Sequence, residues 1–156
     1  MKQHTYQVQV DWTGNEGEGT KSYKGYGRDH TVSADGKAAI ACSSDPQFRG
    51  DAARYNPEEL LIASLSACHM LWYLHLCAVN GVVVVDYHDS PSGVMVEQAD
   101  GGGEFSEATL RPIVEIAKGG DAAKALALHE EAHGFCFIAR SVKFPVAVEA
   151  EVREEG

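Results

Sequence analysis

The chain has 156 residues, a length that suits one domain with a hydrophobic core of its own. Its content of 44% hydrophobic and 23% charged residues is ordinary for a globular protein. A formal net charge of −10 disfavours both a nucleic-acid-binding surface and attraction to an anionic membrane.

The first twelve residues, MKQHTYQVQVDW, have no apolar run of the kind that a secretory signal needs, and no small-residue cleavage site. Without an export signal, the four cysteines are expected to be thiols rather than a disulfide scaffold. These features predict a cytoplasmic protein.

The N-terminal third predicts short strands joined by turns. Residues 5–12 alternate between apolar and polar, so one face of a strand would carry Tyr6, Val8, Val10 and Trp12. A turn at residues 14–19 is followed by more strand and turn, up to a hairpin signal at Asp35-Gly36. Residues 37–44 predict another strand, and residues 45–55 a polar loop.

A long helix is predicted to begin at Asn56-Pro57-Glu58-Glu59. Asparagine can cap the first turn, proline suits the first helical position, and carboxylates suit the positive end of the helix dipole. The helix is expected to run to Asn80-Gly81, where the glycine is a natural stop.

The remaining sequence predicts a hairpin, a second helix and a last strand. The hairpin turns around residues 101–103, the helix covers residues 120–136, and residues 141–152 alternate as a strand. No internal repeat or linker interrupts the chain. We therefore expect a single α+β domain over residues 1–156.

The least polar stretch, residues 63–81, is long enough for a membrane span, about 20 residues. His69, His75 and Asn80 lie within it, and no basic cluster flanks it, so a soluble helix buried on all sides is the better interpretation. Such a helix would pack on a sheet and on a partner subunit. His69 and His75 are then expected to be satisfied residues of that interface rather than metal ligands.

Helical spacing places several chemically notable side chains on one stripe: Leu61, Leu65, Cys68, Trp72 and His75. Cys77 would lie on the opposite side of the helix. Because free cysteine is among the most buried residue types, Cys77 and Cys42 are interpreted as inert core residues.

The segments NPEELLIASLSAC and AHGFC, together with GRD near the N-terminus, resemble the OsmC/Ohr family of osmotically inducible and organic hydroperoxide resistance proteins. The resemblance implies antiparallel sheets packed on a long buried helix and a second helix, in an intertwined homodimer with its sites at the subunit interface. It also implies a thiol peroxidase for organic hydroperoxides that acts in oxidative-stress defence and needs no bound cofactor. The disulfide formed in its reaction would be reduced again by an external, lipoyl-type dithiol.

The resemblance assigns site residues by their matching motifs. Cys68 matches the peroxidatic cysteine, Cys136 the resolving cysteine, Glu58 the site glutamate and Arg28 the arginine of the hydroperoxide-resistance branch. Arg49 lies near the position where the other branch keeps its arginine, so either arginine can fill that role.

A buried thiolate needs a positive charge beside it, because burial alone raises a cysteine pKa above its usual value of about 8.5. Arginine suits this role since it stays charged and can hold a carboxylate as well. Glu58 lies ten residues before Cys68, about 15 Å along the helix, so it cannot reach Cys68 within its own helix. Either an arginine from elsewhere bridges the two, or Glu58 serves the Cys68 of the other subunit, which the dimer implied by the resemblance favours. Leu65, Trp72 and His75 would form an apolar wall for the substrate.

Two alternatives to the peroxidase remain open. The run HEEAH, with His129 and His133 one turn apart, fits the H-E-x-x-H pattern of zinc hydrolases, although no further motif ligand follows. We expect no metal, with His133 packing beside Cys136. A non-catalytic dimer that uses its cysteines for redox sensing or binding is the other alternative.

Overall fold

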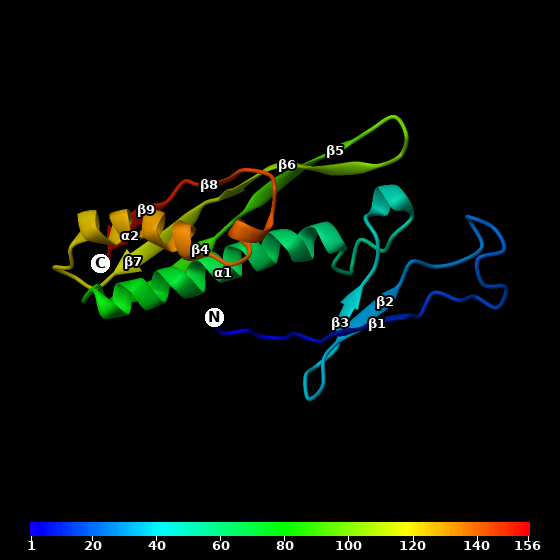
Figure 1. Cartoon of the computed structure of the whole chain (residues 1–156), viewed down its shortest axis with the longest axis horizontal. Helices are drawn as coiled ribbons and strands as arrows, with labels where there is room; N and C mark the ends of the chain where they lie inside the picture. Colours follow the sequence, from blue (N-terminus) through cyan, green and yellow to red (C-terminus); the bar gives the residue numbers. More distant parts are fainter. The chain divides into compact units, whose positions relative to one another are not determined.

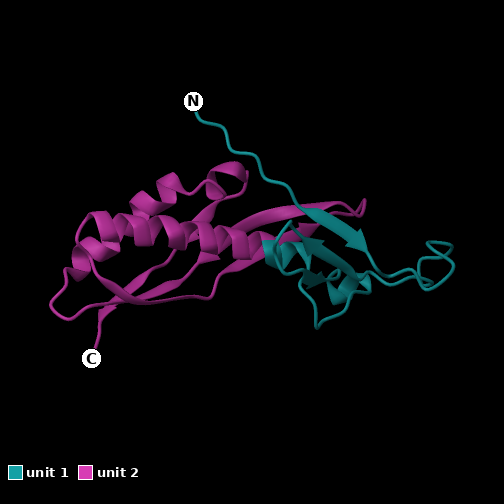
Figure 2. Ribbon diagram, turned by 90° about the horizontal axis from the view of Figure 1, so that it is seen from below, with its two compact units in different colours: residues 1–60 teal, residues 61–156 magenta.

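The computed structural model describes residues 1–156, which form two compact units, residues 1–60 and residues 61–156 (Figure 2). Each unit is described by itself. The single domain expected from the sequence stays a prediction.

The first unit contains a small antiparallel sheet in the order β1-β2-β3, made of Gln9–Trp12, His30–Ser33 and Ile40–Cys42 (Figure 1). Gly36 has φ 72° in the turn between β2 and β3, where the Lys37 N–H donates to the Ala34 carbonyl at 3.1 Å. This turn confirms the predicted Asp35-Gly36 hairpin, since glycine adopts positive φ without strain.

Two details of this unit differ from the prediction. The first strand begins only at Gln9, and the face that carries Tyr6, Val8, Val10 and Trp12 is exposed. The predicted polar loop contains a short 3₁₀ helix, η1, at Pro46–Phe48, because the Asp45 carboxylate accepts a hydrogen bond from the Gln47 N–H at 2.7 Å and caps it.

The long helix α1 covers Pro57–Val79, with both predicted ends confirmed. Asn56 Oδ1 accepts from the Glu59 N–H at 2.8 Å, while Glu59 Oε2 accepts from the Asn56 N–H at 3.2 Å. This reciprocal pair is a capping box. At the other end Gly81 has φ 74°, and the Val82 N–H donates to the Cys77 carbonyl at 2.9 Å.

The second unit contains two three-stranded sheets (Figure 1). One has the order β4-β7-β9, from Val84–Asp89, Pro112–Ile116 and Glu151–Glu154. The other has the order β5-β6-β8, from Ser92–Glu97, Gly103–Leu110 and Val146–Val148. The β5–β6 pair is the hairpin expected around residues 101–103, and Gly101 turns with φ 87°.

The prediction of one strand over residues 141–152 is wrong. The segment forms β8 and β9, which pair in parallel with β6 and β7 and therefore belong to different sheets. The chain passes from one sheet to the other at Arg111, between β6 and β7. It makes the same change again at Glu149 and Ala150, between β8 and β9. The Glu149 N–H donates to the Leu110 carbonyl at 2.9 Å there. Alternation continues through the break, so the pattern could not reveal it.

The core of this unit lies between its helices and β7. The second helix, α2, covers Ala122–Phe135, and the Asp121 carboxylate caps it by accepting from the Lys124 N–H at 2.9 Å. Figure 2 shows α1 and α2 on the same side of the strands. The main buried cluster draws on all three elements: Tyr73, Leu76, Cys77, Val114, Ile116, Ala125, Leu128 and Ala132. Cys77 and Cys42 are buried as predicted.

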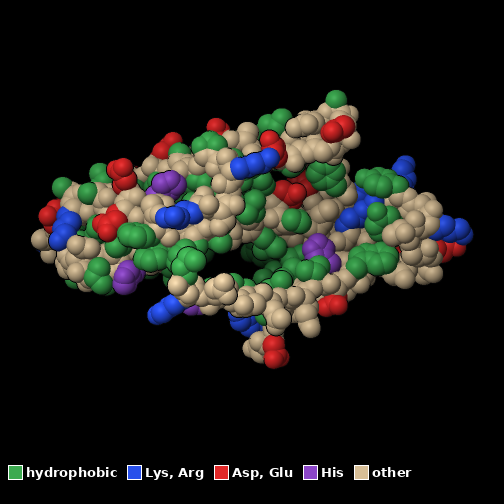
Figure 3. Space-filling model, in the orientation of Figure 1, with side chains coloured by type: hydrophobic (Ala, Val, Ile, Leu, Met, Phe, Trp, Pro, Cys, Tyr) green, Lys and Arg blue, Asp and Glu red, His purple; other side chains and the backbone are tan.

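The helix α1 is the one helix that is long and apolar enough to cross a bilayer, by length and composition alone. The core helix of a soluble protein passes the same test. In the single chain α1 is buried on one side only, because Leu71 and Val79 are 63% and 65% exposed. Hydrophobic surface lies among charged side chains on the face drawn in Figure 3. The cover by a partner subunit stays a prediction.

Candidate functional site

Two of the cysteines singled out from the sequence meet in the second unit. Cys68 lies partly buried in the middle of α1, and Cys136 is buried at the end of α2. Burial, the largest cause, raises the pKa of the Cys136 thiol to about 11. The neighbouring Cys68 side chain also raises this pKa. The two thiols are therefore reduced neighbours that can form a disulfide without a large movement of the chain.

The turn after α2 fixes the Cys136 sulfur. The Cys136 N–H donates to the Ala132 carbonyl at 3.0 Å and ends the helix. The Ala139 N–H, at the start of the 3₁₀ helix η2 (Ala139–Ser141), donates to Cys136 Sγ at 3.4 Å. Hydrogen bonds from the Ala139 and Ile138 backbone act against the rise of the Cys136 pKa. The sulfur is thus held in one position next to Cys68.

Aromatic side chains surround this part of the site. The Trp72 ring stacks on Phe135 at 5.1 Å between centroids and meets Phe137 edge-on at 5.5 Å. Both phenylalanines are adjacent to Cys136 in the chain, and they are 45% and 66% exposed. Phe135 and Phe137 were not among the predicted site residues, although a cysteine between two phenylalanines is a visible signal in the sequence.

The predicted substrate wall divides into separate parts. Trp72 and His75, with ring centroids 5.8 Å apart, line a shallow hollow of about 260 Å³ together with Leu71. Leu65 is fully buried in a second cluster, where it packs with Ala108 and Leu110. The side chains of Trp72, His75 and Leu71 can therefore contact a ligand, whereas Leu65 packs α1 against β6.

In the first unit, Arg28 lies between two tyrosines. Its guanidinium carbon is 3.8 Å from the centroid of the Tyr26 ring and 4.7 Å from that of Tyr23, and it donates to both of their backbone carbonyls. Glu58 belongs to the first turn of α1. Their roles beside Cys68 stay predictions.

The other arginines of this unit differ in their partners. Arg49 has φ 66° and lies 6.0 Å from the centroid of the Tyr23 ring. Arg54, which the sequence analysis did not consider, pairs with Asp29 at 3.3 Å and with Asp51 at 3.8 Å. Asp29, the aspartate of the GRD segment, therefore forms an ion pair with Arg54. Arg28 and Arg49 both lie near the Tyr23 ring.

A buried pair of imidazoles lies between the helices. His69 Nε2 and His129 Nδ1 share a hydrogen bond of 3.0 Å, and Tyr73 stacks on the His129 ring at 3.7 Å. Desolvation by burial lowers the pKa of His69 to about 4 and that of His129 to about 3. Both imidazoles are therefore neutral at pH 7. The pair joins α1 to α2, and the sequence could not predict it because the two histidines lie 60 residues apart.

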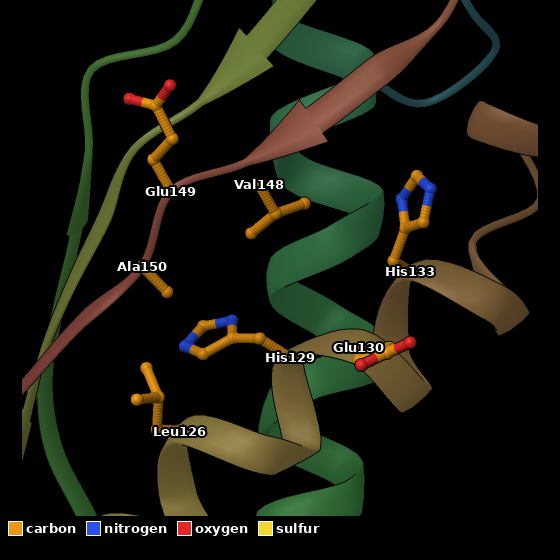
Figure 4. A pocket seen from close by; sticks show the side chains of 7 residues that line it. All are labelled: Leu126, His129, Glu130, His133, Val148, Glu149 and Ala150. Carbon is orange, nitrogen blue, oxygen red and sulfur yellow. The ribbon is translucent and has the colours of Figure 1, made fainter.

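Three of the HEEAH residues, His129, Glu130 and His133, line a pocket of about 490 Å³ between α2 and the link from β8 to β9 (Figure 4). The His129 and His133 rings do not converge on one point there, and the Glu149 carboxylate lies apart from both rings. His129 Nδ1 is occupied by His69. No group of three or more His, Cys, Asp or Glu side chains is placed to hold a metal ion. The side chains as arranged do not fit the zinc site that the pattern suggested.

Comparison with known proteins gives a consistent result. A family model described as OsmC-like protein matches residues 50–151. The structure of an OsmC-like protein of unknown function from Vibrio cholerae is similar with a TM-score of 0.84. It is 30% identical in sequence, over 96% of this chain and 99% of that chain.

Two further solved structures are organic hydroperoxide resistance proteins. The one from Legionella pneumophila is 19% identical over 96% of this chain and 98% of that chain, with a TM-score of 0.67. The one from Bacillus subtilis is 22% identical over the same shares, with a TM-score of 0.61. No curated protein matches the chain.

The neutral imidazole pair predicts an acid-sensitive fold. The folded pKa values of His69 and His129 lie below the usual value of 6.5, so the unfolded chain binds more protons below that pH. The free energy of unfolding is therefore expected to fall as the pH drops from about 6.5 towards about 4. Urea denaturation across this range measures the slope.

His129→Gln is expected to flatten this slope, because glutamine can hydrogen-bond to His69 but does not titrate. His88→Gln, at an exposed histidine, is the matched control and should leave the slope unchanged. An unchanged slope in His129→Gln would show that the buried pair does not control the acid sensitivity.

Proposed function

Because the chain belongs to the OsmC-like protein family, as its sequence resemblance predicted, we propose that it reduces organic hydroperoxides to alcohols. The thiolate of Cys68 attacks the peroxide, so that an S–O bond forms and the O–O bond breaks. The alkoxide leaves as an alcohol after taking up a proton, and Cys68 becomes a sulfenic acid. Attack by Cys136 on the Cys68 sulfur then gives a disulfide and water.

The observation that carries this proposal is the contact between the Cys68 and Cys136 thiols. A sulfenic acid is reversible only if a second thiol reaches it before more peroxide does. Cys136 is that thiol, whereas Cys77 packs in the hydrophobic core and Cys42 belongs to the first unit. An external dithiol, for which the family suggests a lipoyl type, would reopen the disulfide by exchange.

We further propose that the protein acts in the cytoplasm as a homodimer, with Arg28 as the cation beside Cys68 and Glu58 holding it. Arg49 is the alternative cation. Both arginines lie near the Tyr23 ring and therefore occupy neighbouring positions in the first unit. The exposed side of α1, with Leu71 and Val79, offers apolar surface to a partner subunit.

The hollow lined by Trp72 supports the proposal that the substrate is hydrophobic. Its lining by Leu71, Trp72 and His75 gives an organic hydroperoxide apolar surface to bury, whereas hydrogen peroxide has none. The exposed rings of Phe135 and Phe137 extend this surface next to Cys136. An aryl hydroperoxide, whose ring can stack on these side chains, is the substrate class that fits best.

The first test removes the thiols one at a time. Cys68→Ser is expected to abolish consumption of cumene hydroperoxide. Cys136→Ser should stop at a sulfenic acid, which further peroxide over-oxidises because no thiol resolves it. Peroxide assays and intact-protein mass spectrometry measure both outcomes, with Cys77→Ala as the matched cysteine control. Full peroxide reduction by Cys68→Ser would exclude Cys68 as the residue that attacks the peroxide.

The second test concerns the substrate. Cumene hydroperoxide is expected to oxidise Cys68 faster than hydrogen peroxide does, and Trp72→Ala should reduce this preference by about 5–10-fold, the value of one aromatic contact. Val94→Ala, at an exposed site on β5, is the control. Equal rates for the two peroxides in the unaltered protein would contradict an apolar substrate site.

The third test concerns the cation. Arg28→Ala is expected to slow the alkylation of Cys68 by iodoacetamide at neutral pH, because less of the thiol is ionised without a positive neighbour. Glu58→Ala should act in the same direction. If Arg49→Ala slows alkylation and Arg28→Ala does not, Arg49 is the activating residue. Restored activity in a Glu58→Ala/Cys68→Ser heterodimer would support a site shared between subunits, and its absence would contradict one.

A further inference from the structure

The second half of the proposed reaction lacks a proton acceptor. Cys136 must lose its proton before it can attack the Cys68 sulfenic acid, since the thiolate is the nucleophile. Burial opposes that loss and raises the pKa of Cys136 to about 11. The cation proposed for Cys68 serves the first step. A separate base is therefore needed at the end of α2.

The imidazole nearest to Cys136 along the chain is that of His133. It lies one helical turn before Cys136, three residues away in the chain, and residues at this spacing share a helix face. Its Nδ1 is buried and has no hydrogen-bond partner. The same ring lines the pocket between α2 and the β8–β9 link, which connects it to solvent (Figure 4).

We propose that His133 is the general base of the resolving step, a role that rests on the proposed peroxidase function. The imidazole Nδ1 of His133 takes the proton from Cys136 Sγ. The Cys136 thiolate then attacks the Cys68 sulfur, so that an S–S bond forms and the S–OH bond breaks. The leaving hydroxide takes the proton back from the imidazolium and departs as water. Cys136 is oxidised and the Cys68 sulfur is reduced, and His133 ends as it began.

The neighbouring charges are consistent with this role. From α1, His69 lies close enough to interact electrostatically with His133, and from α2 and the β8–β9 link, Glu130 and Glu149 line the same pocket. Arg140 from η2 donates to the Gly134 carbonyl at 3.2 Å. Desolvation by burial lowers the pKa of both His69 and His129, so these two imidazoles are neutral at pH 7.

The experiment separates the two chemical steps. One equivalent of cumene hydroperoxide is mixed rapidly with the reduced protein, the reaction is quenched at intervals, and mass spectrometry follows the sulfenic acid and the disulfide. His133→Gln is expected to leave the rate of Cys68 oxidation within about twofold but to slow disulfide formation about 100-fold, the usual contribution of a general base.

His133→Ala with added imidazole distinguishes a base from a structural residue. Free imidazole can enter the solvent-connected pocket of about 490 Å³ and is expected to restore disulfide formation. His88→Gln is the control and should behave as the unaltered protein. Unchanged disulfide formation in His133→Gln, equal slowing of both steps, or no rescue by imidazole would each overturn the proposal. Failure of the unaltered protein to oxidise Cys68 would instead exclude the peroxidase function itself.

Discussion

Cys68 and Cys136 are neighbours inside the second unit, and the disulfide proposed for the chain depends on that proximity. A disulfide needs its two β-carbons about 3.5–4.5 Å apart, so it forms readily only between side chains that already lie close together. The same burial that holds Cys136 next to Cys68 makes its proton harder to remove. Rapid resolution therefore depends on a base as well as on proximity.

Packing between α1, α2 and β7 sets this contact. Tyr73 on α1 is central, since its hydroxyl donates to the Ala125 carbonyl of α2 at 2.9 Å and its ring covers His129. The His69–His129 hydrogen bond joins the helices in the same region. Because both imidazoles are neutral, the link costs no buried charge at neutral pH. The residues that fix the helices thus also fix the separation of the thiols.

Local signals in the sequence predicted local structure well. Asn56 caps α1 as predicted, and Gly81 ends it, because these effects depend on a few adjacent residues. The family motifs led to Cys68 and Cys136. The His69–His129 pair and the division of the last strand were missed, since both depend on which distant segments pack together. HEEAH left a zinc alternative open for a related reason: the pattern gives the spacing of its histidines, but not the tertiary contacts that pair His129 with His69.

The most direct measurement is the site of the cross-link in the unaltered protein. After one equivalent of cumene hydroperoxide, the intact chain should be two hydrogens lighter, and a non-reducing peptide map should show a single Cys68–Cys136 disulfide. A chain in which Cys68 remains a thiol would contradict the peroxidase function. A disulfide to Cys42 or Cys77 would contradict the assignment of Cys136 as the resolving residue.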